Sequence, residues 1–256
     1  MSINPLFRDE INFRDLGGYK AQDGRVLKHG LIYRSGGIYL MNPEELDHFK
    51  SLGIKYILDL RTAEESRHQP DPVLNQVKMV RHSGVVFRGG EEIDFSPVGM
   101  SKIGQEGLDQ RDHLLSYYTE MPFDNEAFQI LIDELEKNEV PIVFHCATGK
   151  DRTGVAAMVI LTALGIPKET ILQDFLLSNQ YHMPTINRVL EENREKILQH
   201  PILEELLRMR TGVTEKTGKL VLDNIFNRYG SPEKYLEEEF HLTPERLSKF
   251  RDFYLD

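Results

Sequence analysis

The chain alternates short apolar runs with longer segments in which apolar residues return every three or four positions. An apolar run of about four to eight residues between turn residues is typical of a buried strand. Four runs are expected to be strands, at residues 31–33, 54–60, 77–80 and 140–145.

The longer periodic segments predict helices. The first begins at Asn42-Pro43, because Asn is a favoured N-cap and Pro a favoured first helical residue, and it ends at Gly53. Further helices are expected at residues 109–120, 124–137, 155–164, 168–179, 215–229 and 242–254.

Two segments are less regular. Residues 70–105 are rich in Pro and Gly and, outside the strand at 77–80, are expected to be loops. Residues 184–210 are charged and rich in Leu, which predicts a helical hairpin broken at His200-Pro201.

Strands that alternate with helices predict an α/β fold with a central, mainly parallel sheet of about four or five strands and helices on both sides. The length of 256 residues suits one large α/β domain. We expect a single domain over residues 1–256, with residues 181–212 as a helical lid near the functional site.

Charge narrows the function classes. The net charge is −10, from 31 Lys and Arg against 41 Asp and Glu. An acidic protein is poorly suited to general nucleic-acid binding or to electrostatic docking on anionic membranes. A negatively charged substrate would therefore need a local positive site.

The chain has a single cysteine, Cys146. One cysteine excludes an internal disulfide and a Cys-rich zinc site, and it is either a small buried residue or a nucleophile.

The first ten residues lack a basic stretch before an apolar run, and no segment reaches the ~20 apolar residues of a membrane span. We therefore expect cytoplasmic residence, without a signal peptide.

The candidate chemistry lies directly after the strand that ends at His145, in the sequence Cys146-Ala147-Thr148-Gly149-Lys150-Asp151-Arg152-Thr153-Gly154. A small, flexible loop between a strand and an apolar helix can curl its N–H groups around an anion at the positive end of the helix dipole. Arg152 can then hold two phosphate oxygens at once. This environment favours the thiolate of Cys146, which would be placed for in-line attack on phosphorus.

The loop resembles the Cys-x5-Arg signature of the protein tyrosine phosphatase superfamily. The fuller string, ending Gly149-Lys150-Asp151-Arg152-Thr153-Gly154, is similar to the bacterial and fungal tyrosine and lipid phosphatase family. Four further motifs match that family in order: 12–19 (Asn-Phe-Arg-Asp-Leu-Gly-Gly-Tyr), 34–36 (Arg-Ser-Gly), 59–65 (Asp-Leu-Arg-Thr-x-x-Glu) and 229–236 (Tyr-Gly-Ser-Pro-Glu-x-Tyr-Leu). Residues 70–120 match poorly, and nothing is inferred there from the resemblance.

The candidate catalytic residues are Cys146 as nucleophile, Arg152 as phosphate clamp and Asp151 as the proton donor to the leaving oxygen and later the base for water. The resemblance implies that this acid lies within the loop. Asp59 and Asp15 are alternative acids, and Asp151 could instead pair with Arg152 or serve the helix N-terminus.

The other loop residues have expected roles as well. Phosphate contacts are expected from Ala147, Thr148, Gly149, Lys150, Arg152 and Thr153. Lys150 would add a positive charge at the pocket mouth, unless it is simply a solvated lysine. The hydroxyl of Thr153 could donate to the sulfur or cap the helix. His145 should point away from the pocket, because neighbouring side chains alternate along a strand, and should order the loop by hydrogen bonds.

Residues outside the loop are expected to support it. Arg14, Asp15 and Arg34 would line or brace the pocket, and Arg61 would form an ion pair with Glu64 or Glu65. The nine histidines show no ligand spacing such as His-x3-His, so neither a metal nor another cofactor is predicted.

The function predicted from sequence is a cysteine-dependent phosphomonoester hydrolase that acts through a cysteinyl-phosphate. The resemblance implies phosphotyrosine in proteins as the first substrate, with phosphoinositides and phosphoserine or phosphothreonine as additional ones. A non-catalytic phosphate-binding module and a sulfurtransferase are the alternatives. Neither a nucleic-acid partner nor stable membrane insertion is expected.

Overall fold

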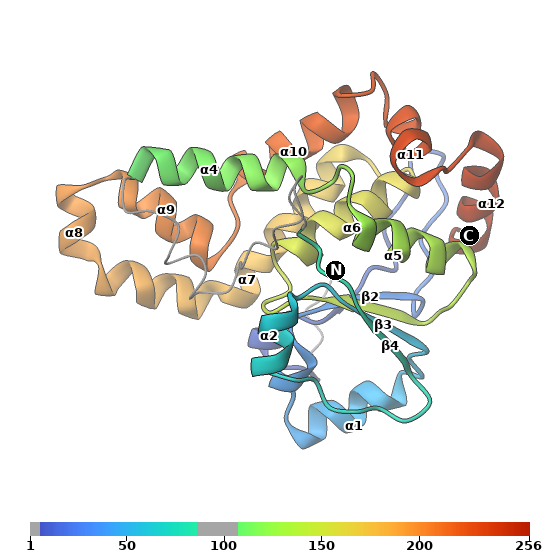
Figure 1. The fold of residues 1–256 in the computed structure, drawn as a ribbon, viewed down its shortest axis with the longest axis horizontal. Helices are drawn as coiled ribbons and strands as arrows, with labels where there is room; N and C mark the ends of the chain where they lie inside the picture. Colours follow the sequence, from blue (N-terminus) through green and yellow to red (C-terminus); the bar gives the residue numbers. More distant parts are fainter. Residues whose placement is uncertain (1–5, 86–106) are drawn as a thin grey trace.

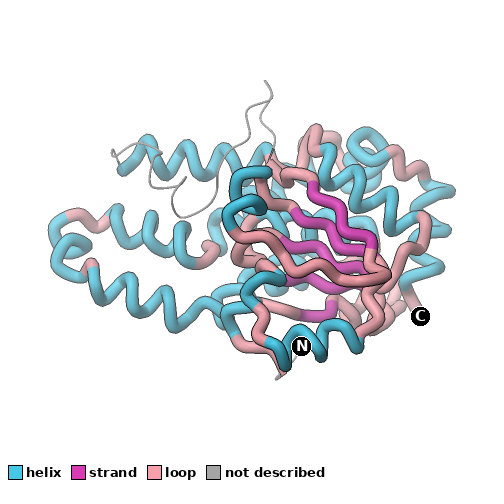
Figure 2. The backbone as a smooth tube through the Cα atoms, turned by 60° about the horizontal axis from the view of Figure 1, so that its bottom comes forward, coloured by secondary structure: helices cyan, strands magenta, loops and turns pink. Residues whose placement is uncertain are grey.

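A computed structural model describes residues 6–85 and 107–256 of the chain. Its strands are β1 (Arg14–Asp15), β2 (Ile32–Ser35), β3 (Tyr56–Asp59), β4 (Lys78–Arg81) and β5 (Ile142–His145). These strands form one sheet in the order β1-β2-β5-β3-β4, which Figure 2 shows with its strands side by side. The pairings of β5 with β2 and β3, and of β3 with β4, are parallel, whereas β1 is antiparallel to β2. The predicted mainly parallel sheet is confirmed.

Helices cover both faces of this sheet. They are α1 (Pro43–Ser51), α2 (Ala63–His68), α4 (Gly107–Glu120), α5 (Glu126–Glu136), α6 (Arg152–Ala163), α7 (Lys168–Glu192), α8 (Arg194–Gln199), α9 (Ile202–Thr211), α10 (Glu215–Asn227), α11 (Pro232–Phe240) and α12 (Pro244–Tyr254), with 3-10 turns η1 (Asp9–Ile11) and η2 (Ile38–Leu40). In Figure 1, α1 and α2 lie on one side of the strands, and α5, α6 and α10–α12 lie on the other.

Side chains of the central strand alternate between two hydrophobic cores, because successive residues of a strand face opposite sides. Ile142 and Phe144 of β5 join the larger core beneath α6, whereas Val143 joins a smaller core that includes Phe49 of α1. All twelve residues of α6 are buried, as expected for a helix that is apolar on every face. Helix α6 begins at Arg152, so its first turn belongs to the candidate sequence 146–154.

The predicted break at His200-Pro201 is confirmed, whereas the expected separation of the segments 168–179 and 184–210 is wrong. Helix α7 continues without a break through Pro184 to Glu192, and the chain then forms α8 and α9, which meet at His200-Pro201. Proline inside a helix removes one backbone hydrogen bond. The buried Tyr181 and Ile186, which flank Pro184 on α7, offset that loss by packing.

Figure 1 shows α8, α9 and the ends of α4 and α7 nearest to them extending away from the sheet. We call this group the helical arm. It contains residues 181–212, for which the sequence predicts a lid. Helix α11 was not predicted, and residues 86–105 of the expected loop region lie outside the described residues.

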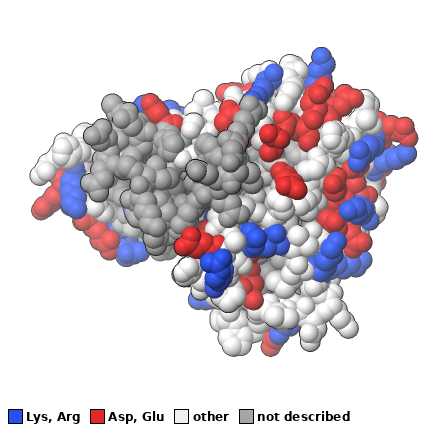
Figure 3. Space-filling model, viewed as in Figure 1, with Lys and Arg blue, Asp and Glu red and all other residues white. Residues whose placement is uncertain are grey.

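Surface charge does not single out a binding face in the view of Figure 3. On the right-hand part of that face, acidic and basic side chains are interspersed over the described helices. Among the described helices, none combines the length and apolarity that crossing a bilayer requires.

Candidate active site

The loop at residues 146–151 joins the carboxyl end of β5 to the N-terminus of α6. Strand β5 lies in the middle of the sheet, between β2 and β3. Parallel strands place the following loops at one edge of the sheet, which is where α/β proteins bind ligands. The positive end of the α6 dipole points at the same loop.

The backbone carbonyls of this loop are held by donors from outside it. Ala147, Thr148 and Gly149 each accept at least one such hydrogen bond. The donors and distances are Gly37 N to Ala147 O at 3.1 Å, Asn12 Nδ2 to Thr148 O at 3.1 Å, His182 Nε2 to Thr148 O at 3.0 Å, and Arg34 Nη2 to Gly149 O at 2.8 Å. A trans peptide holds its C=O and N–H groups antiparallel, so these outward carbonyls turn the N–H groups of residues 148–150 to the inside of the loop. Within the described ranges, these N–H groups donate to no protein acceptor, so they form a ready nest for an anion.

Gly149 is required for this geometry. Its φ is +69°, a conformation that residues with a Cβ rarely adopt. A Cβ at this position would lie 2.6 Å from the backbone of Ser35 and Gly36. The loop therefore packs directly against the end of β2, with no room for a side chain.

Cys146 lies at the base of the loop with a free thiol that is 1% exposed. Thr153, seven residues further along the chain, is fully buried, and its Oγ1 has no hydrogen-bond partner among the described residues. The same holds for Nε of the buried Arg152. Two polar atoms are thus left without protein partners close in sequence to the only cysteine.

Arg152 is fixed by a bidentate ion pair. Its Nη1 and Nη2 donate to Oε2 and Oε1 of Glu65 at 2.6 and 2.8 Å, and Nη1 also reaches Leu60 O at 3.3 Å. Burial lowers the pKa of Arg152, but the Glu65 hydrogen bonds and the charge of Cys146 outweigh it, so the pKa is raised and the guanidinium stays charged. Glu65 is itself held by a capping box with Thr62 at the start of α2.

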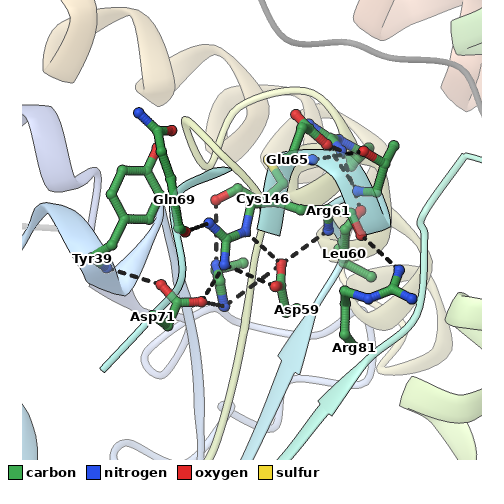
Figure 4. A network of polar contacts seen from close by, with 12 residues as sticks. Tyr39, Asp59, Leu60, Arg61, Glu65, Gln69, Asp71, Arg81 and Cys146 are labelled. Carbon is green, nitrogen blue, oxygen red and sulfur yellow. Dashed lines mark hydrogen bonds and ion pairs between the residues drawn. The ribbon is translucent and has the colours of Figure 1, made fainter. Parts of the chain in front are cut away.

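The predicted pairing of Arg61 with Glu64 or Glu65 is therefore wrong. Arg61 points to the opposite side, where it donates to both oxygens of Asp59 at 2.8 and 2.9 Å and also to Asp71 (Figure 4). Its guanidinium also lies over the Tyr39 ring, 5.0 Å from the ring centre. Glu65 is unavailable because Arg152 already occupies both of its oxygens.

His145 belongs to the same network as Arg61. It is fully buried, its Nε2 lies 3.4 Å from Asp71 Oδ2, and its Nδ1 lies 3.3 Å from Cys146 O. Asp59, Asp71 and His145 bring three potential ligand atoms within 4.8 Å of one another. Both carboxylates accept hydrogen bonds from Arg61, so the guanidinium group of Arg61 neutralises this cluster.

Asp59 is poorly suited to donate a proton. Burial raises the pKa of Asp59, but the charge of His145 and the hydrogen bonds from Arg61 lower it more, so the net pKa is below its usual range. A carboxylate held in its charged form by a bidentate arginine is a structural group.

Arg14 and Arg34 converge on Asp174 of α7, which the sequence analysis did not identify. Arg14 Nε lies 3.0 Å from Asp174 Oδ1, and Arg34 Nη1 lies 2.5 Å from Oδ2. Tyr19 also donates to this carboxylate. Because Arg34 holds Gly149 O, the Asp174 cluster braces the loop from behind. No motif surrounds Asp174, and nothing in the sequence near it marks it as the partner of two distant arginines.

Asp15 does not join this cluster. Its carboxylate accepts hydrogen bonds from the N–H groups of Gly17 and Gly30, both at 2.8 Å, and lies 3.2 Å from His29 Nδ1. The expectation that Asp15 lines the pocket, or serves as an alternative acid, is therefore wrong. Arg14 and Asp15 form a two-residue strand, so their side chains face opposite sides.

Lys150 is not at the pocket mouth, contrary to expectation. It is 5% exposed, and its Nζ lies 2.9 Å from Asp151 Oδ2, 3.1 Å from Gly212 O and 3.5 Å from Met209 O. Burial requires an ammonium group to find such partners. Asp151 pairs with Lys150, not with Arg152, and Tyr118 of α4 also donates to it.

A family model described as the tyrosine phosphatase family matches residues 7–256. The chain therefore belongs to this family and is a phosphatase. A Cupriavidus necator protein that is named as a putative tyrosine-protein phosphatase is 27% identical over 92% of this chain and 84% of its own length. The Mycobacterium tuberculosis protein named triple specificity protein phosphatase PtpB is 25% identical over 66% of each chain.

Solved structures give weaker similarity. The P. aeruginosa protein TpbA, in complex with phosphotyrosine, aligns with a TM-score of 0.32 at 14% identity over 59% of this chain and 70% of its own. The core catalytic domain of the PP-IP phosphatase SIW14 from S. cerevisiae has the same TM-score at 16% identity, over 66% and 92%. Scores this low carry no argument, and membership rests on the family model.

We expect Gly149→Ala to abolish the nest, because its Cβ would collide with the backbone of β2. Displacing the loop by about 1 Å should lower kcat/KM on p-nitrophenyl phosphate by about 100-fold. Gly24→Ala is the matched control, since Gly24 also has a positive φ of +93°, but a Cβ added there would meet nothing within 4 Å. Equal activity of the two variants would contradict this account of the loop.

Asp174→Asn should destabilise the protein in a pH-dependent way. Arg14 and Arg34 outweigh burial and lower the pKa of Asp174 to about 2, against about 3.9 in an unfolded chain. Its stabilising effect is therefore complete above about pH 4 and is lost as the pH falls towards 2. Urea unfolding should show a loss of about 3–5 kcal/mol at pH 7 that shrinks below pH 4.

The control for that measurement is Asp252→Asn, which removes an exposed carboxylate paired with Arg25. Its effect should stay below about 1 kcal/mol. A loss for Asp174→Asn that stays constant between pH 7 and pH 3 would show that the carboxylate charge is not what stabilises the cluster.

Proposed function

We propose that the protein hydrolyses phosphomonoesters in two steps through a phosphorylated Cys146. The observation that carries this proposal is the set of outward-held carbonyls, which turns the N–H groups of residues 148–150 to the inside of a loop that begins at the buried Cys146 and ends at the charged Arg152. This arrangement suits the three equatorial oxygens of a transferring phosphoryl group.

In the first step, the Cys146 thiolate attacks phosphorus and an S–P bond forms as the P–O bond to the leaving group breaks. Asp151 gives its proton to the departing oxygen. In the second step, Asp151 accepts a proton from water, whose oxygen attacks phosphorus, and the S–P bond breaks to return the thiolate. Thr153 Oγ1, buried and without a partner in the described part of the chain, is suited to donate to the sulfur as it leaves.

Glu65 supports the proposed role of Arg152 as a phosphate clamp, because it fixes the orientation of the guanidinium group. The bidentate pair uses Nη1 and Nη2, while Nε has no partner among the described residues. A guanidinium that is already oriented loses less entropy on binding phosphate.

Phosphotyrosine is the substrate that we favour. A second phosphate, as in a phosphoinositide, would need another free cation, but the Nζ donors of Lys150 are directed to Asp151, Gly212 O and Met209 O. Activity on phosphoserine, phosphothreonine or phosphoinositides is an additional possibility, which the name of the M. tuberculosis relative supports for protein substrates.

Cytoplasmic residence and a single domain spanning the chain stay predictions.

The first test is hydrolysis of a phosphotyrosine peptide in the presence of EDTA. Wild-type protein should release phosphate steadily, and Cys146→Ser should lose activity by at least about 1,000-fold while it still binds the peptide. A phosphate-binding module would bind without turnover, so a wild type without activity would overturn the proposal. The same assay with phosphoinositide vesicles ranks the two substrate classes.

The second test concerns the acid. Across a series of aryl phosphates, Asp151→Asn should lower kcat/KM most for the most basic leaving groups, by about 100-fold or more, because these need protonation. Asp59→Asn is the matched comparison. It removes a partner of Arg61 but should leave the dependence on the leaving group unchanged. A steeper dependence for Asp59→Asn alone would move the acid to that residue.

A further inference from the structure

The carboxyl group of Asp151 has a partner outside the loop. The hydroxyl of Tyr118, near the end of α4, donates to Asp151 Oδ1. Both groups are buried, with 3% of Tyr118 and 7% of Asp151 exposed. A buried tyrosine hydroxyl usually has a polar partner, but here the partner is the proposed general acid.

The two oxygens of Asp151 are not equivalent. Oδ1 accepts from Tyr118 and lies 3.0 Å from Lys150 Nζ, whereas Oδ2 has only the Lys150 contact at 2.9 Å among the described residues. A carboxylic acid carries its proton on the oxygen that accepts fewer hydrogen bonds, because the other oxygen is already stabilised as an acceptor. A proton on Oδ2 would therefore displace one donor, Lys150 Nζ, whereas a proton on Oδ1 would displace two.

Both partners of Asp151 are anchored beyond the loop. Lys150 is tied to Gly212 O and Met209 O at the end of α9, and Tyr118 belongs to α4. Helices α4 and α9 contact each other in the helical arm. The orientation of the Asp151 carboxyl is thus set by contacts to α4 and to the end of α9.

Tyr118 is a constant donor over the working pH range. Burial, together with the negative charge of Asp151, raises the pKa of Tyr118 well above its usual value. The hydroxyl therefore keeps its proton whether Asp151 is charged or neutral. Only Asp151 changes its protonation during the reaction.

We propose that Tyr118 is a positioning residue for the general acid. By holding Oδ1, it fixes the carboxyl plane and leaves Oδ2 to give its proton to the leaving oxygen as the P–O bond breaks and the S–P bond forms. Tyr118 neither gains nor loses a proton in this step. The proposal rests on the assignment of Asp151 as the acid.

The experiment is Tyr118→Phe, which removes the hydroxyl and keeps the ring. We measure kcat/KM across aryl phosphates from 4-nitrophenyl to phenyl phosphate, since this ratio reports the steps up to leaving-group departure. The loss should be about twofold for 4-nitrophenyl phosphate and about tenfold or more for phenyl phosphate, because a misplaced acid matters most for a basic leaving group. An equal loss for every substrate would reduce Tyr118 to a structural tie.

Tyr254→Phe is the matched control. Its hydroxyl is also buried and donates to a carbonyl, that of Leu135 at 2.7 Å, but from α12. This variant should follow the wild-type leaving-group dependence. Partial unfolding of either variant lowers the rates on all substrates equally, so the slope still reports the acid in the folded fraction.

Asp151→Asn and the double variant separate the two proposals. If Asp151→Asn does not steepen the dependence, the acid assignment itself fails. If Asp151→Asn steepens it and Tyr118→Phe does not, only the role of Tyr118 is refuted. Adding Tyr118→Phe to Asp151→Asn should cause no further steepening, because the hydroxyl then has no acid to position.

Discussion

Everything in this site depends on keeping the carbonyls of residues 147–149 turned away from the loop interior. A backbone N–H that is buried without a partner costs free energy, and this loop collects several of them around one thiol. Such a loop stays formed only because donors from the N-terminal segment, β2 and α7 bind its carbonyls. An anion bound in the loop, as the proposed function requires, would recover the cost of the unpaired N–H groups.

Buried arginines are the second constraint. Arg14, Arg34, Arg61 and Arg152 are each at most 2% exposed, and every one is matched with a carboxylate from another part of the fold or from its own strand end. The partners are buried as well, with Asp59 6% and Asp174 2% exposed, so each interior cation is neutralised where it lies. Each pair fixes a side chain or carbonyl at the loop, so electrostatics here provides geometry more than stability.

Helix α7 connects these constraints. Asp174 in its first half holds the two N-terminal arginines, and His182, further along, donates to Thr148 O. Burial and the charge of Lys150 lower the pKa of His182, and because a carbonyl oxygen can only accept, the bond to Thr148 O requires the proton on Nε2. The same helix continues into the arm, whose α9 end holds Lys150. Any movement of the arm would therefore act directly on Lys150 and Asp151.

The sequence by itself determined the parallel α/β framework, most helices and the loop that contains Cys146 and Arg152. These features are local, because strand periodicity, caps and a contiguous motif can be read from neighbouring residues. Only the tertiary structure decided the partners: Glu65 for Arg152, Asp71 for Arg61, Asp174 for Arg14 and Arg34, and Tyr118 for Asp151. Such pairs join residues from about ten to 160 positions apart, and no local pattern records which carboxylate folds against which cation. The continuous α7 has the same origin, because packing against the arm outweighs the local signal of Pro184.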